Sequence, residues 1–154
     1  MHSSTAAEPV SRRRLWTGRI LSCLAVLFLL FDSVIKLTRI APVRESFERL
    51  GYHPSVAVGI GLLELACLTL YVIPRTSVLG AILLTGFLGG ATATHVRVGD
   101  PLMSHVLFPT YVGVLVWGGL FLRDARLRAL VPLRSVRRAS FKEASRDTRT
   151  RLIA

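Results

Sequence analysis

Residues 15–37 form an apolar stretch that is long enough to cross a lipid bilayer. A helix of about 23 residues, at a rise of about 1.5 Å per residue, matches the hydrocarbon core of a membrane. Four arginines precede or open the stretch, namely Arg12, Arg13, Arg14 and Arg19. Because basic residues favour retention on the cytoplasmic side, the pattern predicts a transmembrane helix that begins in the cytoplasm.

The same arginines also look like a twin-arginine export signal. The apolar run that follows is long, and no small-residue cleavage pattern comes after it. A retained helix with a positive-inside anchor is therefore the better interpretation.

Three more apolar segments follow, at about 55–73, 76–96 and 101–122. Together with a mean hydropathy of +0.51, they predict an all-α integral membrane protein, a four-helix transmembrane bundle. The bundle domain covers 15–133, between a disordered basic N-terminal arm (1–14) and a basic cytoplasmic tail (134–154).

Two connections carry their own signals. Residues 42–51 begin with a proline and end with a glycine, and Val43, Phe47 and Leu50 recur at helical spacing. We expect a short amphipathic helix on the outer membrane surface, with an ordinary linker as the alternative. At the fourth span, Asp100 looks like an N-cap before Pro101, and Pro109 is expected to kink the helix.

The distribution of charge predicts orientation. The net charge is +11, and most basic residues lie near the two chain ends. This distribution argues against a nucleic-acid-binding protein and for cytoplasmic flanks that face anionic lipid. With the N-terminus inside, four spans also place the C-terminus inside.

The third segment is rich in glycine. Gly86 and Gly90 have the small-x-x-x-small spacing that allows another helix to approach closely. We expect a helix of the same chain as their partner, with a second copy of the protein as the alternative.

Few polar residues occur within or at the ends of the spans, so they are candidates for a ligand-binding site. The predicted topology places most of them near the outer end of the bundle, with Glu64 near the membrane midplane. We expect them to converge on an outward-facing cavity with Glu64 at its floor. The candidates are Asp32, Lys36, Glu64, His95, Arg97 and His105, with Asp100 close by.

A purely structural interpretation stands beside this one. Asp32 and Lys36 are one helical turn apart and can form an intrahelical pair, with Lys36 reaching to the outer interface. The other outer residues can simply lie among lipid headgroups. Glu64 is harder to explain in this way, because a carboxyl at the midplane must be protonated, hydrogen-bonded or paired.

The histidines and cysteines offer little for a metal or redox centre. His95 and His105 could ligate iron or zinc, but no third ligand has suitable spacing, so we expect neither a metal site nor haem. Cys23 and Cys67 lie in apolar segments and do not form a C-x-x-C pair. We expect no disulfide between them.

Several local motifs resemble those of a known family. They are Lys36 at the end of the first span, F-x-x-L-G at 47–51, Glu64 followed by I-P-R at 73–75, and T-H-V-R-x-G-D at 94–100. Over residues 15–133 the chain resembles the DoxX-like family of small four-helix bacterial membrane proteins. That family often has glycine where this chain has Asp32 or Ser33.

The resemblance implies a bacterial inner-membrane protein but no specific catalytic residues. The family takes its name from a subunit of a thiosulfate:quinone oxidoreductase, and some relatives are linked to membrane redox complexes. We therefore expect a small lipophilic ligand such as a quinone, and redox-complex subunits or further copies of the chain as partners. The alternatives are a non-enzymatic assembly or scaffold protein and, less favoured, a transporter subunit.

Overall fold

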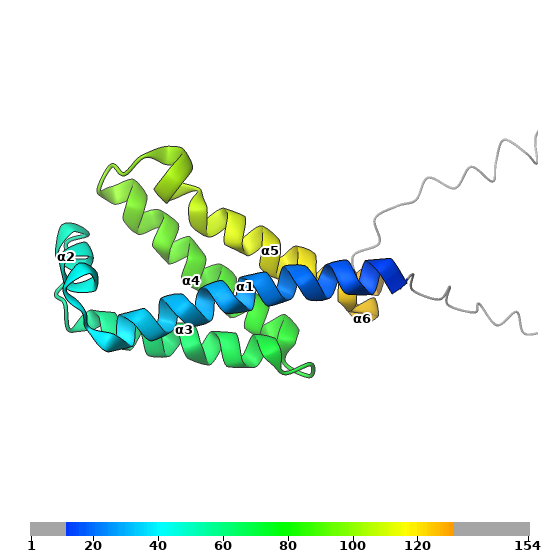
Figure 1. Ribbon diagram of the computed structural model, residues 1–154. Helices are drawn as coiled ribbons and strands as arrows, with labels where there is room; N and C mark the ends of the chain where they lie inside the picture. Colours follow the sequence, from blue (N-terminus) through cyan, green and yellow to red (C-terminus); the bar gives the residue numbers. More distant parts are fainter. Residues whose placement is uncertain (1–11, 131–154) are drawn as a thin grey trace, which may run out of the picture.

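A computed structural model describes residues 12–130 of the chain, with side chains to residue 128. This part of the chain is helical and contains no strand (Figure 1). Its elements are α1 (Arg12–Thr38), α2 (Ala41–Arg49), α3 (Val56–Val72), α4 (Ser77–Arg97), the π-helix η1 (Leu102–Val106), α5 (Phe108–Arg123) and α6 (Ala125–Leu130). The predicted tail, and the predicted arm up to residue 11, lie outside the described residues.

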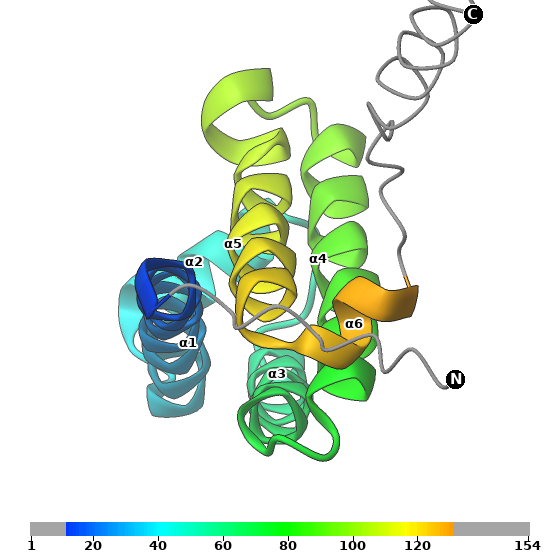
Figure 2. The ribbon, with the colours of Figure 1, turned by 90° about the vertical axis from the view of Figure 1, so that its right-hand side faces the viewer.

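Four long helices surround a common core. In cyclic order they are α1, α3, α4 and α5, each in contact with the next (Figure 2). The short helix α2 lies at one end of this arrangement, and α6 lies at the other end (Figure 1). The structure thus confirms the all-helical class, and the described part of each of the four apolar segments is helical. The helix α1 begins at Arg12 rather than at residue 15.

Three of the long segments are long and apolar enough to cross a membrane. They are α1, α4 and the combined stretch Leu102–Arg123, whereas α3 is a shorter apolar helix of 17 residues. Large apolar side chains also point outward from these helices, with Phe31 and Val114 each 65% exposed. An outer surface of this kind is unusual for a water-soluble monomer and typical of a protein surrounded by lipid.

The core contains a small hydrogen-bonded centre among its apolar side chains. Leu29, Leu84 and Leu120 are almost completely buried within it. The hydroxyl of buried Tyr71 donates to the carbonyl oxygen of Val116 at 2.9 Å and lies 3.0 Å from Ser22 Oγ. Because buried polar groups must be hydrogen-bonded, this centre fixes α1, α3 and α5 relative to one another.

Close approach of the helices depends on other glycines than the predicted pair. A Cβ at Gly80 would lie 2.2 Å from the backbone nitrogen of Tyr71, and a Cβ at Gly119 would lie 2.7 Å from that of Ser22. At Gly86 and Gly90 an added Cβ would meet no atom of the described chain within 4 Å. The expectation of a partner within the chain is therefore wrong for the described residues, because this face of α4 points away from α3 and α5.

The fourth segment differs from the predicted continuous span. It consists of η1 and α5, which meet at Leu107, and Pro109 lies in the first turn of α5. Proline fits there because the first helical turn has no internal partner for its nitrogen. The N-cap prediction for Asp100 is also wrong, since no side chain caps η1 and the Asp100 carboxylate binds Arg49 and His95 instead.

Candidate functional site

An ion triad joins α1 to α3. Asp32 and Lys36 lie one turn apart on α1, and the Lys36 ammonium binds the Asp32 carboxylate. The same ammonium donates to Glu64 Oε2 on α3 at 2.8 Å. The intrahelical pair follows from the i,i+4 spacing, whereas the bond to Glu64 bridges two neighbouring helices.

Burial increases from Asp32 to Glu64. The side chain of Asp32 is 35% exposed, that of Lys36 is 14% exposed, and that of Glu64 is 0% exposed. Lys36 therefore turns into the bundle. This differs from the purely structural interpretation, in which Lys36 reaches to the outer interface. Its ammonium also lies 5.5 Å from the centre of the Phe87 ring on α4, a cation–π distance.

The triad leaves hydrogen-bonding capacity unused. Glu64 Oε1 is buried and has no hydrogen-bond partner among the described residues. An ammonium has three N–H donors, and that of Lys36 uses two of them on Asp32 and Glu64. One acceptor of Glu64 and one donor of Lys36 are therefore left without a partner among the described residues.

A second polar cluster lies where α4 meets η1. Asp100 accepts from Arg49 at 2.9 Å through Oδ1, and its Oδ2 lies 2.6 Å from His95 Nδ1. The ring of His95 meets that of His105 edge to face, with 5.8 Å between the ring centres. His105 Nδ1 in turn lies 2.8 Å from Ser104 Oγ. This cluster connects α2 to the end of α4, because Arg49 is the last residue of α2.

The segment after α2 is held to α4 by further contacts. The Arg97 guanidinium donates to the carbonyl oxygen of Leu50 and lies 5.4 Å from the centre of the Tyr52 ring. The Tyr52 hydroxyl lies 3.0 Å from Thr94 Oγ1. The connection between α1 and α3 is therefore fastened across the end of α4.

The hydrogen bond with His95 lowers the pKa of Asp100 below its ordinary value, and the nearby charges of Arg49 and the histidines lower it further. Partial burial acts in the opposite direction but is the weaker effect overall. Asp100 is thus held as a carboxylate at neutral pH and serves as the negative centre of this cluster.

The six predicted site residues fall into separate groups. Asp32, Lys36 and Glu64 are joined, and His95 contacts His105, whereas Arg97 binds the α2–α3 connection. Among the described residues, no hydrogen bond or ion pair links the triad to the cluster around Asp100. Sequence reasoning did not identify Arg49 as a partner of Asp100, and it did not identify the contact of Tyr52 with Thr94.

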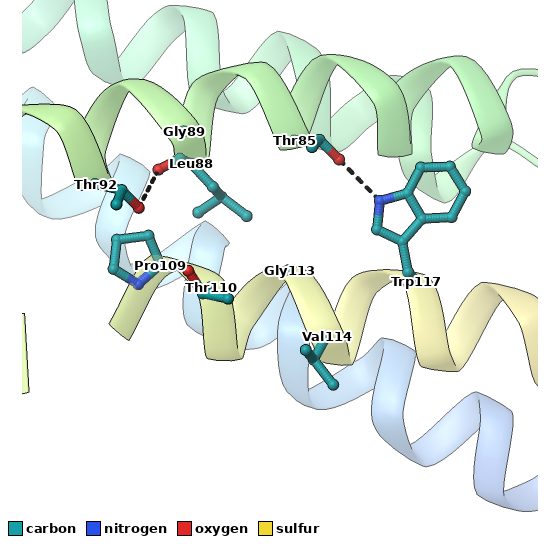
Figure 3. A pocket seen from close by; sticks show the side chains of 9 residues that line it. All are labelled: Thr85, Leu88, Gly89, Thr92, Pro109, Thr110, Gly113, Val114 and Trp117. Atoms are coloured by element: carbon teal, nitrogen blue, oxygen red, sulfur yellow. Dashed lines mark hydrogen bonds between the residues drawn. The ribbon is translucent and has the colours of Figure 1, made fainter. Parts of the chain in front are cut away.

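A groove of about 330 Å³ lies elsewhere, between α4 and α5. Trp117 closes one end by donating from Nε1 to Thr85 Oγ1 at 2.8 Å (Figure 3). The lining contains none of the six predicted residues. It consists of Thr85, Leu88, Gly89, Thr92, Pro109, Thr110, Gly113, Val114 and Trp117.

In the described part of the chain, three potential metal ligands do not come together and the two cysteines are not paired. Between residues 12 and 130, no three His, Cys, Asp or Glu side chains are grouped so that they could hold a metal ion. Cys23 is exposed and Cys67 is buried, and both are free thiols.

Comparison with known proteins identifies one family. The model of the DoxX-like family matches residues 20–119, which include the ion triad and the cluster around Asp100. No curated protein and no solved structure matches the chain.

Proposed function

This chain belongs to the DoxX-like family, and we propose that it is a four-helix membrane protein that binds a small lipophilic molecule, such as a quinone, at Asp32, Lys36 and Glu64. In this proposal it serves as the membrane subunit of a redox system in the bacterial inner membrane. Family membership and the apolar helices indicate a membrane protein, and the finer assignments rest on the arguments that follow.

All four long helices cross the bilayer in this proposal. With 17 residues and a length of about 25 Å, α3 is at the short end of the range for a transmembrane helix. Its neighbours α1 and α4 pack along it, and the outward side chains of Leu62 and Leu63 are 54% and 56% exposed. Such side chains suit a lipid environment, so α3 is the second span.

The observation that carries the proposal is the charge balance of the triad. Two carboxylates share one ammonium, so the fully ionised triad has a net charge of −1 in an apolar bundle. A buried excess charge is costly unless a proton or a ligand compensates it. A hydroxyl group that donates to Glu64 Oε1 would provide such compensation, as would a proton on either carboxylate.

A quinone and its reduced form match this site chemically. A quinone carbonyl can accept from the third N–H of Lys36, and a quinol hydroxyl can donate to Glu64 Oε1. When another subunit of the redox system accepts the two electrons of a bound quinol, the two carboxylates can receive its two protons. In this proposal, His95 and His105 orient the ligand or relay protons at the polar end of the bundle, and Lys36 or Arg97 balances charge.

Replacement of Glu64 by glutamine tests the proposal. The protein is purified from its native membrane, and bound quinone is measured by organic extraction beside a reduced-minus-oxidised optical spectrum. Glu64→Gln should lose most of the bound quinone, while Glu45→Gln on the exposed surface of α2 should retain it. Wild-type protein without extractable quinone, or equal retention in both variants, would refute quinone binding at the triad. A haem band in the spectrum would instead point to His95 and His105.

One observation favours the alternative, an assembly or scaffold protein. The Gly86 and Gly90 positions are open toward the outside of the described chain and could receive a helix of another subunit or a second copy. Gly86→Leu together with Gly90→Leu should then abolish cross-linking to that partner without loss of bound quinone. If both Glu64→Gln and the glycine variant affected only assembly, the scaffold function would be the correct one.

A further inference from the structure

One end of the helix bundle carries a strong excess of positive charge. The beginning of α1, the turn from α3 to α4, the end of α5 and all of α6 lie together at this end (Figure 1). Among the described residues, it holds eight arginines and a single carboxylate, Asp124. The arginines are Arg12, Arg13, Arg14, Arg19, Arg75, Arg123, Arg126 and Arg128.

The opposite end is nearly balanced. Its described cations are Lys36, Arg39, Arg44, Arg49 and Arg97, and its described carboxylates are Asp32, Glu45, Glu48 and Asp100. Ion pairs among the described residues occur only around Lys36 and Asp100, so the arginine-rich end contains none. Its one carboxylate, Asp124, accepts from the backbone nitrogens of Arg126 and Leu127 and is used to start α6.

Two of these arginines are held in fixed positions. The Arg123 guanidinium donates to the carbonyl oxygen of Tyr71 at 3.4 Å and lies 5.1 Å from the centre of the Tyr71 ring. Arg128 donates from Nη1 to the carbonyl oxygen of Leu122 at 2.7 Å. Both side chains are partly buried: Arg123 is the last residue of α5, and Arg128 reaches back from α6 to the last turn of α5.

These fixed guanidinium groups retain unused donors. A guanidinium has five N–H donors, and Arg123 uses one of them in a long hydrogen bond. Its Nε is buried and has no partner among the described residues. Arginine matches phosphate oxygens in a bidentate geometry, and preordered side chains lose little entropy on binding.

We propose that Arg123 and Arg128 form a binding site for the phosphate group of an anionic phospholipid. The site lies at the end of apolar helices that are long enough to span a membrane, where a membrane-spanning bundle would meet lipid headgroups. Basic pockets between helices are known to bind such headgroups. The remaining arginines add a general attraction to the same leaflet. This inference requires a membrane-spanning bundle but does not depend on quinone binding at the triad.

The test is a lipid titration of the full-length protein in neutral detergent. Thermal unfolding is followed while phosphatidylglycerol or phosphatidylcholine is added at fixed ionic strength. Phosphatidylglycerol should raise the unfolding temperature of the wild type more than phosphatidylcholine does. In Arg123→Gln and Arg128→Gln, the phosphatidylglycerol concentration for half of the maximal shift should rise about fivefold or more, because each variant loses a direct charge-assisted hydrogen bond to the phosphate.

Arg126→Gln is the matched control, because Arg126 is an exposed arginine of the same end and the same charge is removed. If the site is specific, the phosphatidylglycerol concentration for half of the maximal shift should change less than about twofold in Arg126→Gln. Arg123→Lys keeps the charge without the planar guanidinium and should fall between the wild type and Arg123→Gln. Should Arg123→Gln not fold, Arg123→Lys and Arg128→Gln still decide the question.

Four results would overturn the proposal. An equal rise of the half-maximal phosphatidylglycerol concentration in all three glutamine variants would mean that the effect comes from overall charge and not from a binding site. No preference for phosphatidylglycerol in the wild type would exclude an anionic lipid. Equal stabilisation by inorganic phosphate at matched ionic strength would identify a free anion as the ligand. Stabilisation by a short RNA but not by phosphatidylglycerol would assign this surface to nucleic acid.

Discussion

Lys36 has a different role from that of a typical basic residue near a membrane surface. Its ammonium is the only described cation in contact with Asp32 and Glu64, and its side chain is only 14% exposed. A lysine that reached for lipid headgroups would leave Glu64 buried without compensation. The stability of the triad therefore depends on this one residue.

Replacement of Lys36 should reveal that dependence. Lys36→Met leaves a buried carboxyl without its cation, and we expect it to lower the free energy of unfolding by about 3 kcal/mol. The double variant Lys36→Met/Glu64→Gln should recover part of this loss, because the uncompensated carboxyl is then absent. Unfolding in mixed detergent measures both variants, and Arg44→Gln on the exposed face of α2 is the control. If Lys36→Met lowered the free energy of unfolding as little as the control does, a structural role for the triad would be contradicted.

Asp100 predicts a dependence of stability on acid pH. Its pKa in the folded protein lies below the ordinary value of 3.8, chiefly because of the hydrogen bond with His95. A depressed carboxyl pKa stabilises the folded state fully above the ordinary value. This stabilisation is then lost as the pH falls through the lower folded-state pKa. The attachment of α2 to the end of α4 should therefore weaken only in that acidic range.

Hydrogen exchange of residues 41–50 and thermal unfolding, measured from about pH 2 to about pH 5, test this expectation. At the upper end of the range, α2 should be less protected from exchange in Asp100→Asn than in the wild type. At lower pH, the protection of α2 in this variant should change little further. Glu45→Gln should follow the wild type, since Glu45 is exposed and makes no ion pair with a described residue. If protection and unfolding temperature changed with pH in the same way in the wild type and in Asp100→Asn, groups other than Asp100 would cause the loss of stability in acid.

At the level of helices, two glycines of α4 provide a matched comparison. Gly80 lies where the backbone of α3 passes at contact distance, while Gly86 is open on the outside of the described bundle. Gly80→Ala should lower the free energy of unfolding by about 1–3 kcal/mol, because backbone atoms of Tyr71 must move. Gly86→Ala should be neutral or stabilise by up to about 1 kcal/mol, since alanine favours the helix. The same unfolding assay measures both, and a larger loss at Gly86 would mean that another helix covers this position.

The helices could be predicted well from the sequence because long apolar runs and their Pro and Gly boundaries are local signals. The predicted spans 55–73 and 76–96 differ from α3 and α4 by one residue at each end. The bond between Lys36 and Glu64 could not be predicted in this way, because it depends on how α1 and α3 are rotated about their axes. The same is true of the glycines, since Gly80 and Gly86 are equivalent in sequence but face different sides of α4.

The break in the fourth span has a comparable origin. Pro109 was expected to bend one continuous helix, and the chain instead forms η1 before α5 begins at Phe108. Helical geometry is disfavoured at the residue before a proline. The sequence does not reveal, however, which hydrogen-bonding pattern the preceding turn adopts. The Asp100 carboxylate could serve as a cap or as an ion-pair partner, and Arg49, 51 residues away, decides between these roles.

For the whole molecule, the unequal charge of the two ends predicts its orientation. Arginine-rich ends remain in the cytoplasm, so the α6 end should face inward and η1 outward. In a variant with Cys23→Ala and Cys67→Ala, a cysteine replaces either exposed Ser104 in η1 or exposed Arg126 in α6. A membrane-impermeant thiol reagent on intact spheroplasts should label Ser104→Cys at once, and Arg126→Cys only after the membrane is opened.

The opposite labelling pattern would place Arg123 and Arg128 in the outer leaflet and remove the electrostatic reason for the predicted topology. The triad is affected differently by this outcome. Asp32 and Lys36 lie near one end of α1 and Glu64 lies within α3, so reversal changes which side of the membrane exchanges protons with them but not their contacts. Orientation therefore decides the direction in which a redox subunit would release protons, and the labelling experiment determines it independently of whether quinone is bound.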